Sequence, residues 1–208
     1  SYGLNTLTNG ELISYWYSKI GNSIAIQTTA ANQPIYVSSN ISFNNLPSIN
    51  FNSDVKGFNF NSNQRIPISN NVTICVVYKI NSASATYNAL FYPSTLSESD
   101  NYSILLRGIT SADGFGVYLQ NASNNISERT FKNSTQDTSP HIAIITSGNG
   151  DAILSIDNSQ TTNGTWNKFT SYLYLSLGLT TRGANANIAE ILIYNNKLNS
   201  NQVTDLSN

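Results

Sequence analysis

The sequence predicts an all-β protein, an antiparallel sandwich or barrel, with one short helix at its C-terminal end. Composition is the first observation: 32 Asn, 29 Ser and 19 Thr fill 80 of 208 positions, and these residues favour turns and caps over helix interiors. Short apolar runs that alternate between two faces are the second observation. The third is that turn residues interrupt these runs about every ten residues, which is typical of sandwiches and barrels.

The N-terminal quarter gives a weak pattern. Residues 1–33 show no clear period, although apolar residues gather between positions 12 and 20. Gln33 and Pro34 begin an extended run over Ile35–Val37. Ser48–Phe51 and Gly57–Phe60 each alternate over a short length, and we expect them to pair across the polar turn between them.

The middle of the chain contains the clearest strand, Val72–Ile80. Its alternation predicts two faces, one formed by Val72, Ile74, Val76, Tyr78 and Ile80, and the other by Thr73, Cys75, Val77 and Lys79. Further strands are expected at Ala89–Tyr92, at Tyr102–Arg107 and at Phe115–Leu119. The polar stretch Gln120–Thr138 is expected to hold at most an edge strand, around Ile126–Phe131.

Two apolar runs after this stretch flank a turn. His141–Thr146 and Ala152–Asp157 stand on either side of Ser147-Gly148-Asn149-Gly150, which predicts a β-hairpin. Asn158–Thr170 is expected to be a polar insertion that carries Trp166. Tyr172–Leu177 is the next predicted strand, with its leucines on the inner face.

The C-terminal stretch predicts a strand followed by a helix. Alternation along Ile188–Tyr194 places Ala189, Ile191 and Ile193 on one face and Ile188, Glu190, Leu192 and Tyr194 on the other. Both faces are mostly apolar, so we expect both to be covered. Asn199 is a helix cap, Gln202 completes a capping box, and Leu198 with Val203 fits a hydrophobic staple. So short a helix is marginal alone and is expected to dock on the sheet.

Length and charge narrow the functional classes. We expect residues 1–208 to form one domain, since all-β domains of this size are common. The formal net charge is −1 and the ten Lys and Arg residues are scattered singly, so a nucleic-acid partner is not expected. No apolar run reaches the length of a membrane span.

Cys75 is the one cysteine, which excludes an internal disulfide and indicates a buried, inert thiol.

Several segments in order resemble a known family. They are Trp16–Val37 (WYSKIGNSIAIQTTAANQPIYV), LPSINF, VTICVVYKI, HIAIITSGNGDAILSID, LYLSLGL and IAEILIYNNKLNSNQVTDL. Together they resemble the laminin-G-like, concanavalin A-like domain, from about Trp16 to the end of the chain. The resemblance implies a two-sheet jelly roll that binds glycans or proteins, although some relatives hydrolyse polysaccharides. The chain departs from the pattern at Ala186 and Asn187, where Gly is common, and at Asp157-Asn158, which replaces Asp-Gly.

Catalytic groups are not expected. Glycoside hydrolysis needs a pair of carboxylates, and the four glutamates, Glu11, Glu98, Glu128 and Glu190, lack the Glu-x-Asp-x-x-Glu arrangement of the hydrolase relatives. By the resemblance, Glu190, His141 and Trp16 fall on structural positions. No cofactor is expected. Calcium stays open, because Asp113, Asp151 and Asp157 are oxygen donors at turns, although such residues are also ordinary turn formers.

Two groups of residues are the predicted ligand-binding positions. Trp166 and Asn163 belong to a polar loop, where an aromatic ring can face a sugar. Tyr118, Tyr172 and Tyr174 are expected on the non-core faces of their strands, with Arg107 nearby. The alternative is that the tyrosines cover a sheet face and that Trp166 folds back on the core.

These observations predict a non-enzymatic module that recognises a glycan or cell-surface receptor. An extracellular or virion-surface location is expected, on a virus or phage fibre, a capsid surface or a bacterial adhesin. The alternative is a structural assembly domain that forms a homo-oligomer or joins a larger virion or surface assembly. A stable closed oligomer without sugar affinity would favour that alternative, and a polysaccharide hydrolase is the least favoured class.

Overall fold

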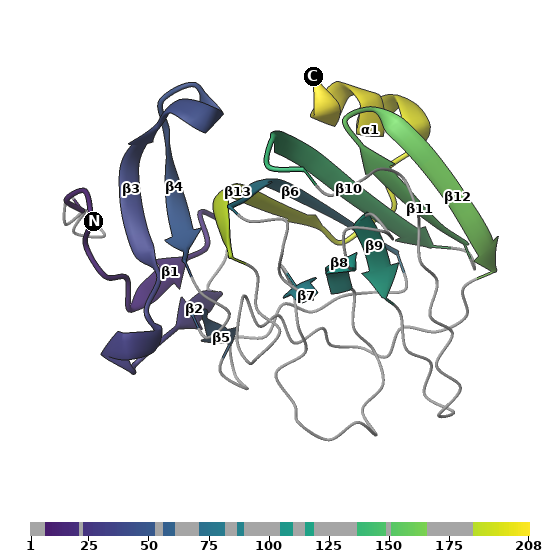
Figure 1. The fold of residues 1–208 in the computed structure, drawn as a ribbon. Coiled ribbons are helices and arrows are strands. Elements are labelled where there is room, and N and C mark those ends of the chain that lie inside the picture. Colours follow the sequence, from purple (N-terminus) through teal and green to yellow (C-terminus); the bar gives the residue numbers. More distant parts are fainter. Residues whose placement is uncertain are drawn as a thin grey trace.

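The computed structural model describes residues 7–20, 23–52, 56–60, 71–81, 87–89, 105–109, 115–118, 137–148, 151–165 and 185–208. Within these residues, one seven-stranded sheet lies over two three-stranded sheets (Figure 1). Every pairing between the strands is antiparallel. The predicted all-β sandwich with one C-terminal helix is therefore confirmed.

The large sheet has the strand order β12-β11-β10-β6-β13-β4-β3. Its strands are β3 (Ile35–Asn40), β4 (Leu46–Phe51), β6 (Val72–Ile80), β10 (Pro140–Gly148), β11 (Asp151–Ile156), β12 (Ser159–Thr165) and β13 (Ala186–Tyr194). The strand predicted most clearly, β6, has the predicted bounds and lies at the centre. Pairing to β10 on one side and β13 on the other shields both of its edges.

The other layer contains two small sheets. One has the order β1-β2-β5, with β1 (Tyr15–Tyr17), β2 (Ile24–Ile26) and β5 (Asn59–Phe60), and the other has the order β7-β8-β9, with β7 (Tyr87–Ala89), β8 (Leu105–Ile109) and β9 (Phe115–Tyr118). Strands are thus present where the sequence predicts the three segments of the second small sheet, with bounds shifted by a few residues. The predicted strands Ile126–Phe131 and Tyr172–Leu177 lie outside the described residues.

The main core lies between the layers. The predicted inner face of β6 is confirmed, because all five of its residues belong to this core. Phe51 of β4 and Phe58, which precedes β5, face each other across the layers with ring centroids 6.0 Å apart. The predicted hairpin of Ser48–Phe51 with Gly57–Phe60 is therefore wrong: β4 pairs with β3 and β13, and β5 pairs with β2. The two segments supply apolar side chains to opposite sides of one core.

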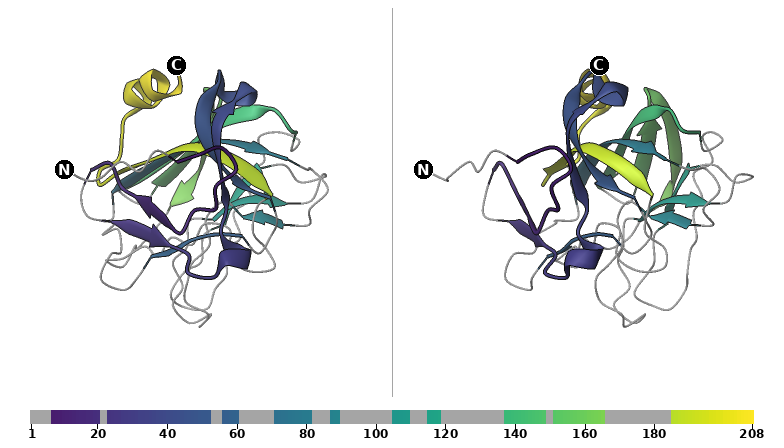
Figure 2. Two further views of the ribbon diagram at one scale, coloured as in Figure 1. Left: turned by 90° about the vertical axis from the view of Figure 1, so that its left-hand side faces the viewer. Right: turned by 60° about the vertical axis from the view of Figure 1, so that its left-hand side comes forward.

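Helix α1 (Ser200–Ser207) covers part of the outer face of the large sheet, on the side away from β1 and β2 (Figure 2). Asn199 Oδ1 accepts a hydrogen bond from the Gln202 amide at 3.0 Å, and Gln202 Oε1 accepts one from the Asn199 amide at 3.0 Å. The predicted capping box is confirmed. Leu198 and Val203 are both buried in a second cluster with Cys75 and Ile144, which is the docking expected of the staple.

A β-bulge in β13 changes its predicted faces. Ile188 pairs with Tyr78 and Glu190 pairs with Val77, so Ala189 is the extra residue. As a result Ile188 shares the main core with Ile191 and Ile193, whereas Leu192 and Tyr194 face the helix cluster. The prediction that Ile188 lies on the Leu192 face is wrong, because one inserted residue reverses the alternation. The prediction that both faces are covered is confirmed.

The turn between β11 and β12 converts a predicted loop into a strand. Asp157 and Asn158 have φ values of 48° and 66°, and a two-residue turn with both φ values positive matches the right-handed twist of a hairpin. The prediction of a polar insertion over Asn158–Thr170 is therefore wrong for Ser159–Thr165. These residues form the edge strand β12, where polar composition is compatible with solvent on the free edge. The predicted hairpin of β10 and β11 is confirmed.

Cys75 is 2% exposed and lies beneath α1. Burial, aided by the Glu190 charge, raises the pKa of its thiol to about 12. A thiol reagent at mildly alkaline pH is expected to leave the folded protein unmodified, because the thiolate fraction falls about a thousandfold relative to a free cysteine. Denaturant should restore reaction at one thiol per chain. Rapid modification of the folded protein would contradict this assignment.

No helix among the described residues is long and apolar enough to span a membrane.

Candidate functional site

Strand β1 presents two tyrosines to solvent on one face. Its sequence is Tyr-Trp-Tyr, and strand alternation turns the middle residue inward. Trp16 packs against the main core, with its ring centroid 6.0 Å from that of Phe58. Tyr15 and Tyr17 are 51% and 58% exposed, and their ring centroids lie 6.2 Å apart with an angle of 31° between the planes. We call Tyr15 and Tyr17 the tyrosine pair.

The position of the tyrosine pair is fixed by the backbone. β1 is an edge strand that pairs with β2, so that Tyr15 lies opposite Ile26 and Tyr17 opposite Ile24. The Ser18 amide donates to the Ser23 carbonyl at 2.9 Å. Both isoleucines are half-buried and, as direct cross-strand partners, share the face of the sheet that carries the two rings. The exposed rings are therefore held on a strand that is hydrogen-bonded to β2.

Polar and charged groups follow the tyrosine pair directly along the chain. Lys19 Nζ lies 3.7 Å from Glu190 Oε1 of β13, with the two side chains 91% and 46% exposed. Ser18 Oγ accepts from the Ile20 amide at 3.2 Å. Aromatic faces beside hydrogen-bonding groups suit a ligand that has both C–H surfaces and hydroxyl groups, as a sugar ring has.

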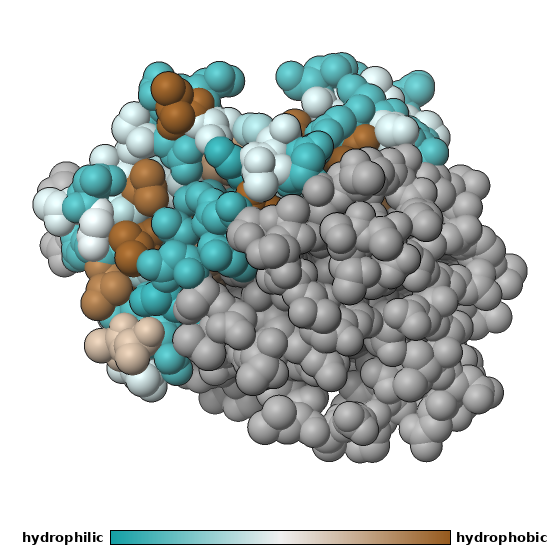
Figure 3. Space-filling model, in the orientation of Figure 1, coloured by the Kyte–Doolittle hydropathy of each residue, from teal (hydrophilic) through white to brown (hydrophobic). Residues whose placement is uncertain are grey.

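Exposed apolar side chains are scattered over the described surface. Figure 3 shows separate apolar patches on a mainly hydrophilic surface over the described part of the chain. The most exposed large apolar side chains among these residues are Ile20, Ile41 and Leu46, at 90%, 85% and 60%. The last two flank the turn that joins β3 and β4.

The predicted site residues divide into three groups. Arg107 of β8 lies opposite Gly116, and Leu105 lies opposite Tyr118 of β9. The backbone pairing brings Arg107 and Tyr118 onto neighbouring strands, and their role in ligand binding stays a prediction. Asn163 lies on β12 at the edge of a different sheet. Trp166, Tyr172 and Tyr174 lie outside the described residues.

Sequence reasoning missed the tyrosine pair. Residues 1–33 lack a clear period, so no alternation was assigned around Trp16. The assignment of Trp16 to packing contains the missing signal, because both neighbours of an inward residue on a strand point outward. Its packing against the core confirms the inward assignment.

His141 is held by two carboxylates. Its Nδ1 lies 2.6 Å from Asp157 Oδ2 and its Nε2 lies 3.0 Å from Asp137 Oδ1. Both ring nitrogens therefore have hydrogen-bond partners, which fits the structural role predicted for this residue.

The acidic side chains at turns are the candidate ligands of a metal site. Over the described ranges no three His, Cys, Asp or Glu side chains come together as a metal site. Asp157 directs its oxygens to His141 and to the Ile142 amide. Asp113 lies outside the described residues, and Asp151 is the first residue of β11. Calcium binding at these turns and an ordinary turn role stay open alternatives.

Comparison with known proteins shows the fold. No protein-family model and no curated protein sequence matches the chain. Among solved structures, Trypanosoma rangeli sialidase in complex with sialic acid is similar with a TM-score of 0.60 and 11% identity, over 94% of this chain and 32% of the sialidase. The chain thus spans about a third of the length of that enzyme.

Two smaller structures match over most of their own length. Domain 4 of AbnA, a GH43 extracellular arabinanase from Geobacillus stearothermophilus, in complex with arabinotriose, has a TM-score of 0.60 and 17% identity, over 84% of this chain and 81% of that domain. The CBM40 of Ruminococcus gnavus IT-sialidase, bound to α2,3-sialyllactose, has a TM-score of 0.55 and 17% identity, over 68% and 84%. At these identities the similarity shows a shared β-sandwich fold.

Proposed function

We propose that this chain is a non-enzymatic glycan-binding module of the laminin-G-like, concanavalin A-like type. The observation that carries the proposal is the tyrosine pair, two exposed rings held side by side on a strand whose middle residue is anchored in the core. The fold supports it, because two solved domains with this architecture are described in complex with arabinotriose and with sialyllactose.

The geometry suggests how such a ligand would bind. The C–H faces of one or two sugar rings would lie on Tyr15 and Tyr17, and their hydroxyls would reach the polar groups around Lys19. A platform of two rings on an open surface buries little area, so a dissociation constant on the order of 0.1–1 mM is expected for one module. If one particle carries several modules, their combined avidity would exceed the affinity of a single module by roughly a hundredfold or more.

The direct test is a glycan array of the purified protein, run with calcium and with chelator. Replacing both tyrosines (Tyr15→Ser with Tyr17→Ser) is expected to lower affinity for a binding glycan about tenfold or more, equivalent to about 1.4 kcal/mol. The fold should persist because both side chains are exposed. The pair Tyr15→Phe with Tyr17→Phe keeps the rings and should retain most binding.

Ile41→Ser serves as the matched control, since Ile41 is exposed but belongs to the β3–β4 end of the sheet. A second set, Trp166→Ala and Tyr174→Ala, tests the positions predicted from the sequence. Binding that survives loss of the tyrosine pair but not loss of the second set would move the site to the predicted residues. Binding unchanged in all variants would overturn both assignments.

The setting we propose is an exposed surface: a virus or phage fibre, a capsid surface or a bacterial adhesin. A charge-poor surface rich in Asn, Ser and Thr supports this setting. A structural assembly domain is the second candidate, favoured by the exposed Ile41 and Leu46 near the β3–β4 turn. Light scattering separates the two, because a closed oligomer that dissociates with Ile41→Ser and Leu46→Ser would identify a protein contact.

Absence of enzymatic activity is part of the proposal. Glu190 is paired with Lys19 on an exposed surface. Release of reducing sugar from a polysaccharide, lost on Glu190→Gln, would replace the binding proposal with a hydrolase.

A further inference from the structure

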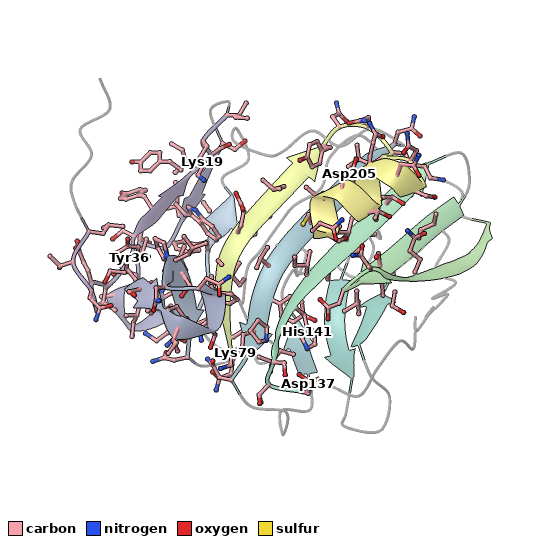
Figure 4. All side chains as sticks on the ribbon, turned by 90° about the horizontal axis from the view of Figure 1, so that it is seen from above. Lys19, Tyr36, Lys79, Asp137, His141 and Asp205 are labelled. Atoms are coloured by element: carbon pink, nitrogen blue, oxygen red, sulfur yellow. The ribbon has the colours of Figure 1, made fainter. Side chains whose placement is uncertain are left out.

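His141 connects two chain segments that are separate in sequence. It lies at the start of β10, and its side chain is 14% exposed. Asp137, four residues earlier, belongs to the segment that enters β10, and Asp157 begins the turn between β11 and β12. Figure 4 shows Asp137 and His141 together at the end of the large sheet. The ring is thus the link between the entry to β10 and that turn.

The two contacts require two protons on the ring. An ionised carboxylate only accepts hydrogen bonds, and a neutral imidazole has one N–H. The distances of 2.6 Å at Nδ1 and 3.0 Å at Nε2 are both hydrogen-bond distances. Both bonds exist together only when His141 is an imidazolium. Loss of one proton leaves a nitrogen lone pair facing a carboxylate.

The two carboxylates are anchored differently. Asp157 Oδ1 accepts from the Ile142 amide at 2.9 Å, and the Asp157 amide donates to the Ile142 carbonyl at 3.0 Å. Asp137 accepts from the Ser139 amide at 2.6 Å, which is a bond within its own segment. Asp157 therefore stays on β10 without the histidine, whereas the contact that ties Asp137 to the strand runs through Nε2.

We propose that His141 is a proton-operated latch, which fastens residues 137–139 to the β11–β12 turn when the ring is protonated and releases Asp137 when the ring is neutral. The neutral ring keeps its proton on Nδ1, toward the firmly held Asp157. The Nε2 atom then has no proton to donate to Asp137. Its lone pair and the Asp137 carboxylate oxygen are both hydrogen-bond acceptors, so they repel each other and separate.

The other groups near the ring do not replace it. Tyr78 of β6 packs against the ring with centroids 5.8 Å apart, and burial, with Asp157 and Asp137, raises the pKa of its phenol well above the usual value, so it stays neutral. Lys79, the next residue on β6, faces the opposite side of the sheet and donates to Ser42 Oγ at 2.8 Å. Within the described part of the chain, the charges that face His141 are thus the two aspartates.

The electrostatics favour the protonated ring and therefore the closed latch. Burial by itself lowers the pKa of His141, but hydrogen bonds and charges from Asp157 and Asp137 outweigh it and raise the pKa above its ordinary value. The Ser139 amide and then His141 lower the pKa of Asp137 despite its desolvation, so this carboxylate remains ionised. The stability from the latch is therefore complete below the unfolded pKa of histidine, about 6.5, and disappears as pH rises through the folded pKa.

The chain contains one histidine, so a single imidazole resonance reports the latch in the full-length protein. We would follow this resonance by NMR against pH, together with the ¹⁵N heteronuclear NOE of the amides of residues 137–139. The expected result is a midpoint above about 6.5 and a fall in the NOE of these amides through the same midpoint. The amide of Ile142 should change little, because its bond to Asp157 does not need the second proton.

Asp137→Asn removes one charge from an exposed position, so folding should be retained. It is expected to move the histidine midpoint down and to abolish the pH dependence of the NOE. Asp205→Asn on α1 removes the same charge elsewhere (Figure 4) and should leave both readouts unchanged. A midpoint at or below the ordinary value, or NOE values at 137–139 that do not follow the titration, would overturn the latch.

Discussion

Phe58→Ala is expected to lower the free energy of unfolding by about 3–5 kcal/mol. Phe58 is fully buried, and its ring lies 6.0 Å from Trp16 on one side and 6.0 Å from Phe51 on the other. It therefore fills the space where the β1-β2-β5 layer meets the large sheet. Truncation removes apolar burial and leaves a cavity that two neighbouring aromatic rings cannot fill without moving.

Equilibrium denaturation followed by tryptophan fluorescence measures this change, since Trp16 is next to the substituted residue. Ile41→Ala is a suitable control, because Ile41 is 85% exposed and its truncation should cost less than about 0.5 kcal/mol. A loss below about 1 kcal/mol for Phe58→Ala would mean that the two layers are not joined through this residue.

Thr73→Val is expected to lower the free energy of unfolding by about 2–4 kcal/mol, and to loosen α1 before the rest of the fold. Thr73 is fully buried on β6. Its Oγ1 donates to the Asn196 carbonyl at 2.9 Å and accepts from the Leu198 amide at 3.0 Å. Valine has nearly the same shape but no hydroxyl, so two backbone groups at the base of the helix lose their partner.

Hydrogen exchange of the α1 amides, together with denaturation, tests this expectation. Thr204→Val makes the same chemical change on the exposed surface of α1, where Oγ1 only donates to the Ser200 carbonyl. It should change stability by less than about 0.5 kcal/mol. Equal effects of the two substitutions would show that the hydroxyl of Thr73 does not anchor the helix.

The candidate site was accessible from the sequence only in part. The family resemblance places Trp16 in the core, and the outward position of Tyr15 and Tyr17 follows once Trp16 lies on a strand. That the two rings lie on an open edge of the fold depends on the pairing of β1 with β2, which places Ile26 and Ile24 opposite them. Similarly, Arg107 lies on a strand next to that of Tyr118 because of the β8–β9 pairing, which no local pattern specifies.

The elements that the sequence predicted correctly depend on interactions between residues that are close together in the chain. The cap at Asn199 and Gln202 joins residues three apart, and the faces of β6 follow from alternation in nine residues. One error is local, the Asp157-Asn158 turn that pairs β11 with β12, and the others concern partners distant in sequence. β4 and β5 enter opposite layers instead of one hairpin, and the bulge at Ala189 exists because β13 must fit β6. Register, bulges and layer assignment depend on how separate strands fill one core, so only the tertiary structure decided them.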